Sequence, residues 1–215
     1  MVTAVVIPAK DEAARIAATV AAALPIGVVV VVDDGSSDDT AAVAERAGAR
    51  VVRHPRNRGK AAAMESGAAA VPEAELLVFL DADLGATAAE GAKLARVVEA
   101  GEADAAIGTL PPVGAAGGHG FVVRLARDGI ERATGWAPTQ PLSGQRALSR
   151  RAFRAVLPLA DGFGVETAMT IDLLLHGFRV VEVPTTMAHR VTGTGWRDQL
   201  HRARQYRDVR RALRR

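Results

Sequence analysis

Short apolar runs alternate with alanine-rich stretches along the first half of the chain, and this rhythm constrains the fold more than any other feature. The apolar runs are unbroken series of valine, isoleucine and leucine, which is typical of strands covered by helices on both faces. Strands and helices in alternation predict an α/β fold with a mainly parallel sheet. The expected elements are, in order, residues 5–7, 12–23, 28–32, 39–47, 50–53, 60–70, 76–80 and 87–100.

The alternation breaks at residues 111–120, which are rich in glycine and proline and predict a loop. We therefore expect one domain over residues 1–195, with halves at 1–110 and 111–195, followed by a basic helix at 196–215. The 49% of hydrophobic residues are ample for a core. The remaining expected elements are a strand at 103–107, a helix at 121–134, a strand at 142–148, helices at 150–156 and 165–176, and a strand at 179–183.

Two carboxylates, Asp81 and Asp83, follow directly after the apolar run 76–80. Open α/β sheets bind their ligands at the carboxyl ends of the strands. Two carboxylates at such a place repel each other and are partly desolvated, and a divalent cation with a diphosphate ligand would remove both costs. The motif predicts a metal site, although a turn or a helix cap explains so short a motif equally well.

Three further motifs fall at strand ends on the same expected edge. Pro8 stops the first strand and Glu12 opens a helix, an arrangement that an N-cap also explains. Asp33 and Asp34 end the second strand before a glycine turn, and helix capping does not account for them. Lys60 stands with free backbone amides at a helix N-terminus, which suits a phosphate but lacks the P-loop pattern.

This ordered set resembles the family 2 glycosyltransferases, whose GT-A fold is a Rossmann-like three-layer sandwich around a mainly parallel sheet. The resemblance covers the first 110 residues well and the remainder more loosely, and the family has a tyrosine-asparagine pair or similar where this chain has Lys10-Asp11. The matching segments are Ile-Pro-Ala-x-x-Glu at 7–12, Val-Asp-Asp-Gly-Ser-x-Asp-x-Thr at 32–40, Asn-x-Gly-Lys at 57–60 and Asp-Ala-Asp at 81–83.

The resemblance implies a site for a nucleotide sugar in the half 1–110. Asp34 would hydrogen-bond the base or the ribose, and Asp83 would hold a Mg²⁺ or Mn²⁺ ion that bridges the diphosphate and stabilises the departing charge. The residues implied to bind the nucleotide are Pro8, Ala9, Glu12, Asp34, Lys60, Asp81 and Ala82, of which the first three would border the nucleoside.

The second half is expected to bind the acceptor and, if the reaction inverts configuration, to supply a general base. Glu166 starts a helix behind a glycine-rich turn and is our candidate for the base or for an acceptor contact, while stabilisation by the helix dipole is the structural alternative. Two further segments resemble the glucosyl-3-phosphoglycerate synthase branch of the family: Pro-Leu-Ser-Gly-Gln-Arg at 141–146 and His-Arg at 189–190. They imply acceptor contacts from Gly144, Gln145 and Arg190. In that branch a histidine matching His189 completes the metal site, although a surface role is the alternative for a lone histidine.

The positive charge is concentrated at the C-terminus. Residues 197–215 contain eight arginines and two aspartates, which gives this stretch a net charge of +6. The whole chain has a net charge of +3, so residues 1–196 carry −3. A basic amphipathic helix there would either pack on the domain or lie on an anionic membrane surface. Nucleic acid is not an expected partner, because aromatic residues make up only 4% of the chain and no nucleic-acid motif is present.

We therefore expect a metal-dependent glycosyltransferase that moves a hexose from a nucleotide sugar, UDP-linked, to a small phosphorylated or polyprenyl-phosphate acceptor. The expected location is the cytoplasm, with peripheral contact to the inner membrane face, and a homodimer is plausible for this branch. The family implies inversion of configuration and the synthase-type motifs imply retention, so the stereochemistry stays open. The alternatives are a sugar-phosphate nucleotidylyltransferase and a noncatalytic nucleotide-binding or nucleic-acid-binding protein.

Overall fold

Seven strands form one sheet in the computed structural model, which describes residues 1–111 and 120–188. The strand order is β3-β2-β1-β4-β6-β5-β7, and β6 runs antiparallel to both of its neighbours, whereas the other pairs within these residues are parallel. The strands are β1 (Thr3–Ala9), β2 (Val28–Asp33), β3 (Arg50–Arg53), β4 (Leu76–Phe79), β5 (Ala105–Thr109), β6 (Arg146–Ser149) and β7 (Val180–Pro184).

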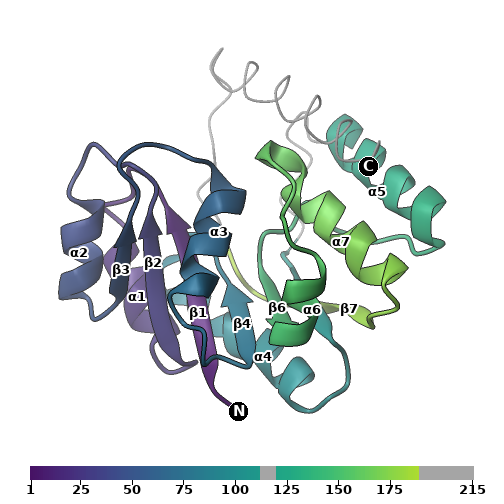
Figure 1. Cartoon of the computed structure of the whole chain (residues 1–215), viewed down its shortest axis with the longest axis horizontal. Helices are drawn as coiled ribbons and strands as arrows, with labels where there is room; N and C mark the ends of the chain where they lie inside the picture. Colours follow the sequence, from purple (N-terminus) through teal and green to yellow (C-terminus); the bar gives the residue numbers. More distant parts are fainter. Residues whose placement is uncertain (112–119, 189–215) are drawn as a thin grey trace.

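Helices cover both faces of this sheet. In Figure 1, α3, α6 and α7 lie in front of the strands, and α5 lies beside α7. No helix of the described ranges combines the length and apolar composition that a bilayer crossing demands. The helices are α1 (Ile16–Ala23), α2 (Thr40–Arg46), α3 (Lys60–Ala69), the 3-10 helix η1 (Gly85–Glu90), α4 (Gly91–Glu99), α5 (Gly120–Thr134), α6 (Arg150–Ala155), the 3-10 helix η2 (Gly162–Gly164) and α7 (Val165–Leu175).

The sheet separates two apolar cores. Successive side chains of a strand point to opposite faces, so Ala4 and Val6 of β1 join the core beneath α3, α6 and α7. Val5 and Ile7 join the core formed with α1, α2 and α4. All four residues are fully buried. The unbroken apolar runs thus match a three-layer arrangement, and the predicted α/β fold with a mainly parallel sheet is confirmed.

The structure corrects three boundaries. The helix expected from residue 12 begins at Ile16, and the amides of Glu12 and Ala13 donate to the side chains of Thr40, at the start of α2, and Asp38. The strand expected at 142–148 is β6, which starts only at Arg146. The helix expected at 87–100 is divided into η1 and α4. The basic helix expected at 196–215 lies outside the described residues.

Gly67 lies where α3 packs tightly against β1 and β2 of the sheet. A Cβ atom there would overlap Val6 and would lie 3.0 Å from Cγ2 of Val32. We expect Gly67→Ala to lower the free energy of unfolding, measured by urea denaturation, by about 1–2 kcal/mol, because overpacking outweighs the gain in helix propensity. Gly120→Ala in α5 is the control, since no atom lies within 4 Å of the place that its new methyl group would take. An unchanged stability of Gly67→Ala would contradict the close packing.

Candidate active site

The carboxyl ends of β1, β2 and β4 meet at one edge of the sheet, because these strands are parallel neighbours. Asp33 ends β2, and Asp81 and Asp83 follow β4. Since β6 runs antiparallel beside β4, the residues that precede it, Gly144 and Gln145, arrive at the same edge. The candidate active site therefore combines residues from both halves of the chain.

Lys60 is the central cation of this edge. Its Nζ atom lies 2.8 Å from Oδ1 of Asp81 and 2.9 Å from Oε1 of Glu166. Burial acts to lower the pKa of Lys60, but the charges of the two carboxylates and their hydrogen bonds outweigh it and raise the pKa above its ordinary value. Lys60 is therefore a permanent positive charge that joins α3 to β4 and to the first turn of α7.

Gln145 and Gly144 fit closely around Asp81. Gln145 is fully buried; its Nε2 donates to Oδ2 of Asp81 at 2.6 Å, and its Oε1 accepts from the Asp81 amide at 3.0 Å. A Cβ atom at position 144 would collide with Nζ of Lys60 and would lie 3.1 Å from both carboxylate oxygens of Asp81. A methyl group at 144 would therefore displace the Lys60 ammonium from its position beside Asp81, both of whose carboxylate oxygens have protein partners.

Arg146 places a second buried cation near Glu166. Its side chain, from a residue only 2% exposed, donates from Nε to the Ser143 carbonyl and from Nη1 to the Thr170 hydroxyl, both at 2.9 Å. Burial lowers the pKa of Arg146 to about 10, and the charges of Glu166 and Glu182 oppose this shift. Glu166 therefore lies between two cations, at the helix end where the dipole also favours a carboxylate.

Asp34 is buried at the end of β2 and binds the loop that leads into α3. Its Oδ1 accepts from the Arg58 amide and its Oδ2 from the Gly59 amide, each at 2.8 Å. Its own amide donates to the Ala9 carbonyl at 2.9 Å, which ties it to the end of β1. The imidazole of His54 also contacts Oδ1, at 2.7 Å.

Asp11 joins the loop after β1 to the loop after β2. It has a φ of 56°, a left-handed conformation that aspartate tolerates better than most residues. Its Oδ1 accepts from the Ser37 amide at 2.7 Å and from the Ser37 hydroxyl at 3.0 Å, and its Oδ2 accepts from Lys10 at 2.8 Å. These contacts, the Lys10 bond first, hold the pKa of Asp11 at about 2.

Asp83 is a candidate carboxylate ligand for a divalent cation at this edge. It is half-buried and follows Asp81, whose oxygens bind Lys60 and Gln145. Carboxylate oxygen is the donor type that Mg²⁺ and Mn²⁺ prefer. Residues 1–111 and 120–188 contain no cluster of three or more ligating side chains. The predicted ligand His189, like Arg190, lies outside these ranges.

The structure brings together five residues that the sequence pointed to: Lys60, Asp81, Gly144, Gln145 and Glu166. Ala82 is anchored separately, since its carbonyl accepts from the Thr19 hydroxyl of α1 at 2.8 Å.

Pro8, Ala9 and Glu12 lie along the end of β1 and the loop after it. The sequence reasoning missed His54, Arg146 and the inter-loop role of Asp11. The position of Asp11 two residues after the end of β1 was the available signal for the last of these.

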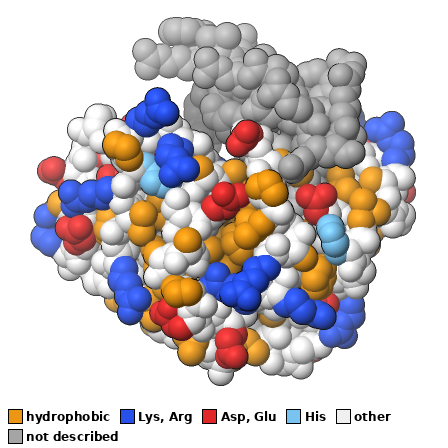
Figure 2. Space-filling model, in the orientation of Figure 1, with side chains coloured by type: hydrophobic (Ala, Val, Ile, Leu, Met, Phe, Trp, Pro, Cys, Tyr) orange, Lys and Arg blue, Asp and Glu red, His pale blue; other side chains and the backbone are white. Residues whose placement is uncertain are grey.

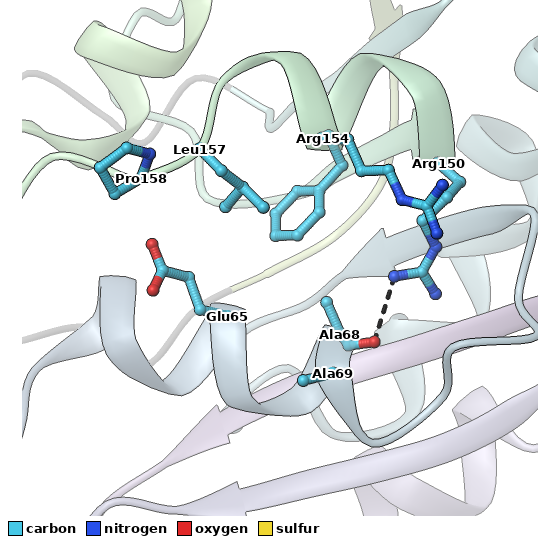
Figure 3. A pocket seen from close by; sticks show the side chains of 8 residues that line it. Glu65, Ala68, Ala69, Arg150, Arg154, Leu157 and Pro158 are labelled. Atoms are coloured by element: carbon cyan, nitrogen blue, oxygen red, sulfur yellow. Dashed lines mark hydrogen bonds between the residues drawn. The ribbon is translucent and has the colours of Figure 1, made fainter.

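A shallow cavity of about 360 Å³ lies away from this edge, between α3 and α6 (Figure 3). Phe153, Leu157 and Pro158 line it, with Glu65 at one end and Arg154 at the other. Figure 2 shows apolar side chains exposed over this part of the molecule, with basic side chains beside them. The guanidinium of Arg150 donates to the carbonyl of Ala68 in α3 at 3.1 Å and to two carbonyls of the segment that follows α3, and so has a structural role.

Comparison with known proteins gives one family. The model of the glycosyl transferase family 2 matches residues 4–157. Glycosyltransferase AglJ from Haloferax volcanii is 32% identical over 168 residues, which are 73% of this chain. The chain spans about half of the length of AglJ, namely 52%.

Two solved structures of glucosyl-3-phosphoglycerate synthase from Mycobacterium tuberculosis are similar over 99% of this chain. The complex with Mn²⁺, uridine diphosphate and phosphoglyceric acid is 29% identical, with a TM-score of 0.82 and 77% of that chain covered. The complex with Mg²⁺ and uridine diphosphate is 28% identical, with a TM-score of 0.82 and 78% covered.

The depressed pKa of Asp11 predicts a pH-dependent contribution to stability. Its charged form stabilises the folded protein above the unfolded value of 3.8, and this contribution is lost as the pH falls through about 2. We expect wild-type protein to be more stable than Asp11→Asn in urea denaturation at pH 6, with the difference shrinking as the pH is lowered from 4 towards 2. Asp39→Asn is the control, because Asp39 makes no side-chain capping bond. A pH-independent difference for Asp11→Asn would contradict the assignment.

Proposed function

The chain belongs to glycosyl transferase family 2, and we propose that it is a metal-dependent hexosyltransferase that uses a UDP-linked sugar and a phosphorylated acceptor. The observation that carries the proposal is the cluster of Lys60, Asp81 and Glu166 beside Asp83, at the carboxyl edge of a parallel sheet. This edge is where α/β folds bind nucleotides. The cluster supplies a cation for phosphate and a carboxylate for a metal at one place.

The fold agrees with this function. The mixed sheet, mostly parallel and covered by helices on both faces, is the GT-A fold, shared with the two synthase complexes at a TM-score of 0.82. The family assignment favours a transferase over a sugar-phosphate nucleotidylyltransferase or a noncatalytic binding protein.

On the donor side, we infer that the nucleoside lies against Pro8, Ala9 and Glu12 and that Asp34 bonds the base or the ribose. A carboxylate can accept more than the three bonds that Asp34 makes in the described structure. The diphosphate would then lie near Lys60, Asp81 and Ala82. Its negative charge would compete with Asp81 and Glu166 for the Lys60 ammonium.

We infer that Asp83 holds the divalent metal, together with His189. A bound Mg²⁺ or Mn²⁺ ion would act as a Lewis acid that stabilises charge on the departing diphosphate. The chain's own contribution is to fix the neighbouring carboxylate, since Lys60 and Gln145 both bind Asp81. The synthase complexes contain Mn²⁺ or Mg²⁺ together with uridine diphosphate, which supports this part of the proposal.

On the acceptor side, Glu166 is our candidate for a general base or an acceptor contact. Its Oε1 atom is bound by the Lys60 ammonium at 2.9 Å, which leaves other acceptor positions of the carboxylate for an acceptor hydroxyl. Gly144, Gln145 and Arg190 stay predicted acceptor residues, although Gln145 is buried against Asp81 in the described structure. The phosphoglyceric acid of the synthase complex supports a small phosphorylated acceptor, and a polyprenyl phosphate is the alternative of the same chemistry.

The domain division, the homodimer, the cytoplasmic location and contact of residues 196–215 with a membrane stay predictions. They do not enter the test of the function.

The test is calorimetric titration of UDP, GDP, UDP-glucose and GDP-mannose with Mn²⁺ and then with EDTA. We expect UDP and its glucose conjugate to bind only with the metal, and Asp83→Asn to weaken this binding at least tenfold, because a carboxylate ligand is lost. Asp128→Asn, the same change at an exposed site on α5, is the control and should bind as wild type.

Two outcomes would contradict the proposal. Nucleotide binding that survives both EDTA and Asp83→Asn would indicate a noncatalytic binding protein. Folded wild-type protein that binds none of the four nucleotides would overturn the transferase assignment for this chain.

A further inference from the structure

His54 follows β3 and is buried between two polar side chains. Its Nδ1 lies 2.7 Å from Oδ1 of Asp34, and its Nε2 lies 2.9 Å from Oγ of Ser66 in α3. The side chains of His54 and Asp34 are only 4% and 8% exposed. Because a carboxylate can only accept, Nδ1 must donate to Asp34, while the Ser66 hydroxyl can either donate or accept.

The backbone of His54 is fixed as well. Its amide donates to the Asp33 carbonyl at 2.9 Å, so the imidazole cannot leave Asp34 by a simple shift of the loop. Close packing next to Asp34 adds to this restraint. A Cβ atom at Gly35 would lie 2.7 Å from backbone atoms of Arg56 and Asn57, so the loop rests directly on the end of β2.

These contacts close a ring around the start of α3. Asp34 accepts from the amides of Arg58 and Gly59, and Gly59 is the N-cap residue of α3, with a φ of 90°. The next residue, Lys60, reaches Asp81 and Glu166. Ser66 lies about two turns further along α3, and its hydroxyl contacts His54, so the ring of contacts ends at the residue where it began. The orientation of Asp34 and the position of Lys60 therefore depend on the same histidine.

We propose that His54 is a positioning residue for nucleotide binding. It orients the Asp34 carboxylate and, through the Arg58 and Gly59 amides, sets the start of α3 that presents Lys60 to the diphosphate. This inference rests on the proposed function, because it takes Asp34 and Lys60 as the groups that meet the nucleotide.

Two substitutions separate the two ring nitrogens. The amide nitrogen of asparagine lies where Nδ1 of histidine lies, so His54→Asn can keep the bond to Asp34 and loses the bond to Ser66. The amide nitrogen of glutamine reaches the place of Nε2, so His54→Gln can keep Ser66 and loses Asp34. Ser66→Ala is the matched control, because it removes the far partner and leaves the His54–Asp34 pair.

The first measurement is the affinity for UDP in Mn²⁺, by calorimetry on folded protein checked by thermal unfolding. We expect His54→Gln to lose about tenfold in affinity, the effect of one charge-assisted hydrogen bond. His54→Asn and Ser66→Ala should stay within about threefold of wild type. A purely structural role predicts lower melting temperatures for both His54 variants and equal UDP affinity in their folded fractions, which would overturn the proposal.

The second measurement needs no nucleotide. Hydrogen exchange of the Arg58 and Gly59 amides should be faster in His54→Gln than in His54→Asn, because both amides donate to Asp34. Equal exchange in the two variants overturns the positioning role. If wild-type protein binds no UDP while these amides still respond to His54→Gln, the proposed function fails and the link from His54 to Asp34 stands.

Discussion

The candidate site depends on the two ion pairs that Lys60 makes with Asp81 and Glu166. Its ammonium joins Asp81, at the end of a strand from the first half of the chain, to Glu166, in a helix from the second half. Without it, the carboxylates of Asp81 and Glu166 would lack the cation that lies between them, and like charges close together are strongly unfavourable in a low-dielectric environment. The two ion pairs of Lys60 therefore stabilise the contact between the halves of the chain. They also bring together the residues that could meet a diphosphate.

The charges around Lys60 alternate in sign, from Arg146 through Glu166 and Lys60 to Asp81. In this formally balanced row, Asp81 and Arg146 are also held by neutral partners. Gln145 binds both the amide and the carboxylate of Asp81, and Thr170 binds Arg146. Fixed dipoles and charges of this kind are already oriented before a ligand arrives, which is the condition for electrostatic stabilisation of a departing diphosphate.

The fold was largely predictable from the sequence, because β1, β2 and β4 are unbroken apolar runs and such runs require cover on both faces. The motif residues Lys60 and Asp81 were predictable because they follow strand ends. The pairing of Gln145 with Asp81 was not, since it depends on β6 running antiparallel beside β4, a contact between residues 64 positions apart. His54 carried no local signal either: a single histidine after a charged strand has many ordinary explanations, and only the fold places it against Asp34.

Asp34 connects the two roles that we propose for this edge, nucleoside binding and placement of Lys60 for the diphosphate. A carboxylate has several acceptor positions, and this one uses three of them for His54 and for the amides at the start of α3. Any group that bonds Asp34 from the nucleoside side must share its charge with those donors. A change in the orientation of Asp34 would therefore be passed to Gly59 and to Lys60, whose ammonium lies between Asp81 and Glu166. If the proposed function holds, recognition of the nucleoside by Asp34 and placement of Lys60 for the phosphate are coupled through the first turn of α3.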